Sequence, residues 1–138
     1  MGHDLFGQLL HEAAPPGARF GHRQHVHLTW LAVRRYGMPA AVQVVSDGIR
    51  RTARYAGAPQ KYHATVSRAW VEIVAHHADA WPTDDFDEFA ATNPELLDKR
   101  LLSRFYTSGT LAGAEARTGW VLPDRERFPF SDEKLGGG

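Results

Sequence analysis

The chain has 138 residues, of which 43% are hydrophobic and 23% are charged, a balance typical of one globular domain rather than of a disordered chain. Lysine plus arginine and aspartate plus glutamate each number 16, and the resulting net charge of zero argues against a general nucleic-acid binder. The lack of cysteine excludes disulfides, iron–sulfur clusters and thiolate zinc sites.

Helix signals recur along the whole chain, and proline or glycine separates most of the expected helices from one another. These helices are expected over residues 4–13, 22–36, 39–56, 60–80, 84–91, 95–106 and 110–117. No window shows the alternation of a strand, and short connections should make the four long helices antiparallel. We therefore expect an all-α bundle of about six to seven helices with an extended C-terminal tail. Residues 1–130 would form one domain and 131–138 a flexible end.

The sequence contains no apolar run long enough to cross a bilayer. Its start, Met1 to Phe6, lacks the basic region and the apolar stretch of a signal peptide. A cytoplasmic location without a membrane partner is the expectation that follows.

Eight histidines are the unusual feature of the composition. A step of about 100° per residue places His25 near the centre of the apolar face of the 22–36 helix and His22 on its flank. His63 lies on the apolar stripe of the 60–80 helix. Because alternate antiparallel helices point the same way, these three histidines should meet at one end of the bundle.

Histidines at i and i+3, joined by a third from a facing helix, can hold one metal ion and leave positions open for water or substrate. Imidazole suits iron, copper and zinc, so the ligand type does not choose the metal. Tyr62 and Glu12 are the expected proton-handling groups near that site. The residues expected to contact the substrate are Lys61, Arg50, Thr52 and Tyr106.

The leading hypothesis is a small metalloenzyme that acts on a small organic molecule, with His22, His25 and His63 as ligands. Oxidation is slightly favoured over metal-assisted hydrolysis or lyase chemistry, because no protein nucleophile is evident. A second hypothesis keeps the pocket without the metal and makes the histidines general acids and bases of an isomerase, lyase or cyclase. A third is a non-enzymatic module that binds a small molecule or a protein. Homodimerisation through the arginine-rich or acidic faces is left open.

Three short motifs carry a resemblance, namely F-x-H-x-x-H at residues 20–25, K-Y-H-x-T at residues 61–65, and Trp70. The pattern resembles that of a group of small bacterial helical proteins and covers about residues 20–125. The resemblance implies a helical fold and assigns no catalytic role to any residue.

Overall fold

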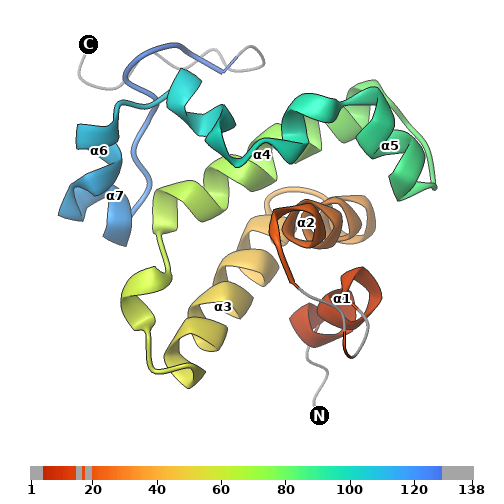
Figure 1. The fold of residues 1–138 in the computed structure, drawn as a ribbon, viewed down its shortest axis with the longest axis horizontal. Helices are drawn as coiled ribbons and strands as arrows, with labels where there is room; N and C mark the ends of the chain where they lie inside the picture. The colour runs from red at the N-terminus through yellow and green to blue at the C-terminus, as the bar shows by residue number, and fades with distance from the viewer. Residues whose placement is uncertain (1–4, 15–16, 18–19, 129–138) are drawn as a thin grey trace.

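Residues 5–14, 17 and 20–128 are described by a computed structural model, and every regular element in these ranges is a helix (Figure 1). The all-α bundle expected from the sequence is therefore confirmed. None of the helices in these ranges is long and apolar enough to span a membrane. The α-helices are α1 (Leu5–Ala13), α2 (His22–Tyr36), α3 (Ala40–Tyr55), α4 (Ala64–Ala80), α5 (Phe86–Thr92), α6 (Ser108–Ala112) and α7 (Ala114–Thr118). The 3₁₀ helices are η1 (Pro59–Lys61), η2 (Pro94–Leu97) and η3 (Lys99–Arg104).

Helix α2 lies at the centre of the molecule, packed against α1, α3 and α4. Its residues 28–32 are all buried, so the helix is covered on every side along this stretch, as expected of a core helix. Figure 1 shows α2 nearly end-on while α3 and α4 run across the view. The long helices therefore cross α2 instead of lying alongside it, and this crossing decides which helix ends come together.

Three of the expected helices are divided in the structure. The 60–80 helix breaks at Tyr62 and His63, because the extended backbone of His63 caps a helix that begins only at Ala64. The 95–106 helix is two 3₁₀ pieces separated at Asp98, whose carboxylate accepts a hydrogen bond from the backbone N–H of Arg100. The last helix is divided at Gly113, which has an extended backbone.

The segment after α7 runs without regular structure as far as Phe128, and it is attached to α4 and to the chain after η3. Thr65 donates to the carbonyl of Gly119 and accepts from the backbone N–H of Val121. The Tyr106 hydroxyl donates to the carbonyl of Val121 at 2.7 Å, and Phe128 is buried. The described part of the tail thus packs on the bundle, while the expected flexible end at 131–138 lies outside the described residues.

Candidate functional site

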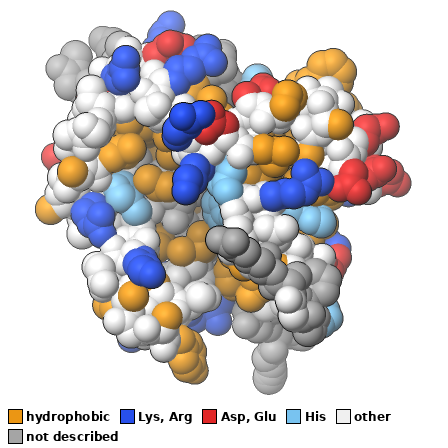
Figure 2. Space-filling model, viewed as in Figure 1, with side chains coloured by type: hydrophobic (Ala, Val, Ile, Leu, Met, Phe, Trp, Pro, Cys, Tyr) orange, Lys and Arg blue, Asp and Glu red, His pale blue; other side chains and the backbone are white. Residues whose placement is uncertain are grey.

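An apolar cavity of about 370 Å³ opens between α1, α2, α3 and η1. Its volume lies in the lower part of the range found for small-molecule sites. On the face shown in Figure 2, hydrophobic side chains are visible in the hollow between the two sides of the molecule. The cavity is lined by Phe6, Leu10, Phe20, His25, Leu28, Ile49, Thr52, Ala53, Ala56, Ala58 and Lys61.

Small side chains at the end of α3 leave the space that the cavity occupies. Ala53 and Ala56 extend only a methyl group toward it, and Ala58 does the same from the turn after α3. Higher on α3, Gly48 lets the ring of Phe6 lie directly against the helix backbone, where an added Cβ would be 2.0 Å from its Cγ atom. Phe6 thus closes one side of the cavity, while the alanines keep the other side open.

His25 is the one imidazole that the described part of the chain contributes to the cavity wall. Its backbone carbonyl accepts from Thr29, and its ring lies 6.1 Å from that of His22, centroid to centroid. Among the described residues, the two ring nitrogens of His25 have no hydrogen-bond partner. The residue is half-buried, and it lines the cavity.

Burial lowers the pKa of His25 to about 4, and the neighbouring charge of His22 adds to the effect. The ring is therefore neutral near pH 7 and offers one N–H donor and one nitrogen acceptor. An imidazole with both roles available, set in an apolar wall, is the chemically distinctive feature of the cavity.

Two further polar side chains reach the cavity from α3 and η1. The Thr52 hydroxyl donates to the carbonyl of Gly48 at 2.8 Å, which keeps its oxygen lone pairs available as acceptors. Lys61 is exposed and lines the cavity. No carboxylate belongs to the wall among the described residues, so Lys61 is the one permanent charge there.

His22 opens α2 and binds the backbone instead of the cavity. Its Nε2 atom donates to the carbonyl of Leu96 at 2.9 Å, and its ring meets that of Trp70 edge-on at 4.7 Å. Burial lowers the pKa of His22, and the hydrogen bond to Leu96 opposes that effect. His22 therefore joins α2 to η2 while its ring stays next to His25.

His63 uses both ring nitrogens to stabilise the fold. Its Nδ1 atom accepts from the backbone N–H of Val66 at 3.1 Å and caps α4, and its Nε2 atom donates to the carbonyl of Leu111 at 2.7 Å. A neutral ring with this tautomer has no nitrogen left for a metal or a substrate. A histidine near a helix start often caps the helix or binds a backbone carbonyl, and His63 has these roles instead of the one expected of a metal ligand.

The described residues contain no group of three or more histidine, aspartate or glutamate side chains placed to hold a metal ion. The structure thus brings His22 and His25 together and leaves His63 out. The prediction that all three histidines meet at one end of the bundle assumed antiparallel helices. Because α2 crosses its neighbours, that assumption does not hold. Metal binding through His22 and His25 stays a prediction.

The other residues selected from the sequence are divided between the cavity and other parts of the fold. Lys61 and Thr52 line the cavity. Glu12 lies at the opposite end of α2 from His22, where both of its carboxylate oxygens accept from Arg35 at 2.5 Å. That hydrogen-bonded pair lowers the pKa of Glu12, so its carboxylate is a poor proton acceptor.

Arg50, Tyr62 and Tyr106 lie outside the cavity wall. The guanidinium of Arg50 lies 5.8 Å from the ring centroid of Tyr62 and 3.4 Å from a carboxylate oxygen of Asp47. Tyr106 is buried and holds the C-terminal segment through Val121. The wall that α1 contributes through Phe6 and Leu10 was not expected, and Gly48 was the available signal, since a glycine inside an apolar helix often marks a close approach.

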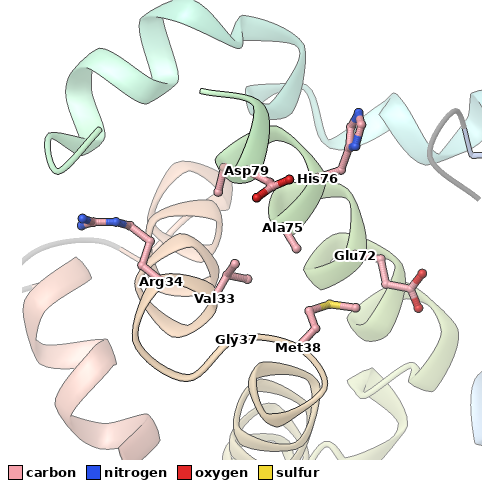
Figure 3. Close-up of a pocket in the computed structure, with 9 residues that line it drawn as sticks. Val33, Arg34, Gly37, Met38, Glu72, Ala75, His76 and Asp79 are labelled. Atoms are coloured by element: carbon pink, nitrogen blue, oxygen red, sulfur yellow. The ribbon is translucent and has the colours of Figure 1, made fainter. Parts of the chain in front are cut away.

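A second hollow, of about 520 Å³, is an open groove between the end of α2 and α4 (Figure 3). Two of its charged side chains are engaged elsewhere, since Arg34 lies over the ring of Trp30 and Glu72 binds Arg68 at 2.6 Å. In Figure 3 the side chains of His76 and Glu72 point away from the space above Val33. The smaller cavity, with its unpartnered imidazole, is therefore the candidate functional site.

The chain matches no protein-family model, no curated protein and no solved structure. The geometry of the cavity therefore carries the functional argument.

Proposed function

We propose that the protein binds a small, mainly apolar organic molecule in the cavity between α1, α2 and α3. One observation carries the proposal: the apolar wall holds the His25 ring, whose nitrogens have no partner among the described residues. A polar group in an apolar setting costs free energy unless it is hydrogen-bonded. A ligand with one oxygen at the level of His25 would supply that hydrogen bond and fill the space beside it.

The wall composition supports binding as the main role. Among the described residues of the wall, all but His25 are aliphatic or aromatic side chains, one threonine and one lysine. With its pKa lowered to about 4, His25 is a hydrogen-bonding group at neutral pH and not a charged one. Recognition by shape and one or two hydrogen bonds is the usual pattern of a small-molecule site.

The catalytic hypotheses from the sequence need more groups than the cavity brings together. The metalloenzyme requires a third ligand in place of His63, which caps α4. The acid–base enzyme requires more than one histidine at the cavity, whereas His63 caps α4 and His22 binds the carbonyl of Leu96. Both stay predictions, whereas the binding proposal requires only the cavity and His25.

Calorimetric titration with octanol tests the proposal. We expect one saturable site in the parent protein and loss of that site in Ala56→Trp, because Ala56 is an exposed residue whose enlarged side chain would fill the cavity. Ala80→Trp is the matched control, since Ala80 is an exposed alanine at the end of α4, outside the cavity. Circular dichroism of both variants establishes that they are folded.

Two results would overturn the proposal. One is the absence of saturable binding for any octyl compound, whatever its head group. The other is octanol binding that survives Ala56→Trp in a folded protein, which would place the bound molecule elsewhere.

A further inference from the structure

Basic residues are frequent in the stretch of chain that contributes Lys61 to the cavity wall. Between Asp47 and Glu72 the chain has no acidic residue, and this stretch forms the second half of α3, η1 and the start of α4. Its five lysine and arginine residues are Arg50, Arg51, Arg54, Lys61 and Arg68. Arg50 pairs with Asp47 and Arg68 pairs with Glu72, and of the five only Lys61 is among the described residues of the cavity wall. In Figure 2, blue side chains are spread over the side of the molecule where α3 and the start of α4 lie, and a red cluster marks the edge near α5.

Two of the groups in the cavity wall favour an anion at the mouth. Lys61 is the one permanently charged side chain of the wall among the described residues, and an ammonium can donate three hydrogen bonds. Neutral His25 can donate one N–H bond to an oxygen of the same ligand. Apart from Thr52, the other described residues of the wall are apolar, which suits a ligand with a hydrocarbon body.

We propose that the ligand is an amphiphilic carboxylic acid, with its apolar body in the cavity and its carboxylate at the mouth beside Lys61 and within the reach of His25. This inference rests on the proposed function and names the class of molecule that the same cavity selects. A carboxylate fits better than an alcohol, because it meets both the cation and the N–H donor. A cationic amphiphile would instead place its charge beside the Lys61 ammonium, and the described residues supply no carboxylate to the cavity wall.

The size of the cavity sets the length of the probe. A volume of about 370 Å³ is roughly twelve times the ~30 Å³ that one water molecule occupies in the liquid. A molecule of about ten non-hydrogen atoms therefore fits with little space left over. Octanoate, octanol and octylammonium share one chain of this size and differ only in the head group.

Calorimetric titration of the parent protein with these three compounds, and with acetate as a head group without a chain, tests the ligand class. We expect octanoate to bind about five-fold more tightly than octanol, which is the scale of one partly exposed ion pair. Octylammonium should bind more weakly than octanol, and acetate should show no saturable binding.

Variants of Lys61 separate charge recognition from a structural role. Lys61→Gln should reduce octanoate affinity to that of octanol, while octanol affinity stays the same. Lys61→Glu should reverse the order, so that octylammonium becomes the best of the three ligands. Lys99→Gln removes an exposed lysine of η3 that is outside the cavity wall, and it should change none of these affinities by as much as two-fold.

The outcomes distinguish this inference from the proposal on which it rests. If none of the octyl compounds binds, the proposed function fails. If octanol binds as tightly as octanoate and neither Lys61 variant changes their order, the cavity binds apolar molecules without selecting acids. That second outcome overturns only the assignment of the ligand class.

Discussion

The sequence predicts both His25 and His63 on apolar helix faces, and the structure gives the two histidines opposite environments. Both ring nitrogens of His63 bind backbone groups, one at the start of α4 and one at the end of α6. The ring of His25 has neither nitrogen engaged among the described residues, and it borders an open cavity. The difference teaches that the hydrogen-bond partners of a histidine indicate its role. A ring with both nitrogens bonded stabilises the fold, and an unpartnered ring beside a cavity can bind a ligand.

The regions around the two histidines differ in the same way. Near His63, buried Thr65 is bonded to Gly119 and Val121, and the carboxylate of Asp124 accepts hydrogen bonds from Thr107 and Thr110. Around His25 the wall is apolar, with alanines at the end of α3. The region around His63 is held together by hydrogen bonds between segments that are distant in the sequence. The region around His25 instead contains the cavity.

The largest effect is expected from removing the bonded histidine. His63→Ala leaves the N–H of Val66 and the carbonyl of Leu111 without their partner and also removes the helix cap. We expect the free energy of unfolding to fall by about 3 kcal/mol, as measured by urea denaturation. His25→Ala should cost about 1 kcal/mol or less, because no hydrogen bond of the ring is lost with it.

A capping variant divides the His63 effect into its parts. His63→Asn retains a side-chain oxygen that can accept from the Val66 N–H, so it should recover about 1 kcal/mol of the loss. The bond to Leu111 would remain broken. Equal destabilisation by His63→Ala and His25→Ala would contradict the contrast between the two rings.

The second effect is a dependence of stability on pH that His25 imposes. In the unfolded chain His25 takes up a proton near its ordinary pKa of 6.5, but in the folded protein burial lowers that pKa to about 4. As the pH falls from 6.5 toward 4, the unfolded state therefore binds more protons than the folded state, and the free energy of unfolding decreases. His25 alone should account for a loss of about 2 kcal/mol between pH 7 and pH 5.

A matched variant isolates that contribution, because burial lowers the pKa of His22, His27 and His76 as well. His25→Gln keeps a polar side chain without a titrating ring, so its stability should decrease less between pH 7 and pH 5 than that of the parent. Urea denaturation at both pH values measures the difference. Parallel decreases in the two proteins would mean that His25 titrates near its ordinary value.

Much of the fold was predictable because helix punctuation is local. The glycines and prolines that end the first helices can be recognised in the sequence. Helix α2 begins at His22 and ends at Tyr36, as the pattern predicts. The breaks that divide the expected helices after Pro59 were harder to predict from the sequence. His63, which caps α4, also donates to the carbonyl of Leu111, which lies 48 positions away, and no local pattern encodes such a bond.

The site was predictable only in part, because a helical wheel gives a face but not a crossing angle. The wheel placed His25 correctly toward the interior. It could not show that α2 is covered on several sides, so that His25 faces α1 and α3 while His63 bonds to α6. Lys61 and Thr52 were assigned to the substrate on the basis of a shared helix end, and both do line the cavity.

The smallest effect concerns the contact that closes the cavity. In Gly48→Ala the added methyl group would lie 2.0 Å from the Cγ atom of Phe6, so the ring must move. The overpacking lowers the free energy of unfolding by about 1–3 kcal/mol, and the higher helix propensity of alanine raises it by up to about 1 kcal/mol. We therefore expect a net loss of about 1 kcal/mol in urea denaturation.

The same displacement connects packing to binding, because Phe6 also lines the cavity. A ring pushed away from α3 alters the space that holds the octyl chain, so Gly48→Ala should weaken octanol binding in calorimetry as well as stability. Gly109→Ala is the control, since no atom lies within 4 Å of an added Cβ on that glycine of α6, and it should stabilise the protein by a few tenths of a kcal/mol. If Gly48→Ala stabilises the protein as Gly109→Ala does, then Phe6 moves without resistance and does not hold the cavity wall in place.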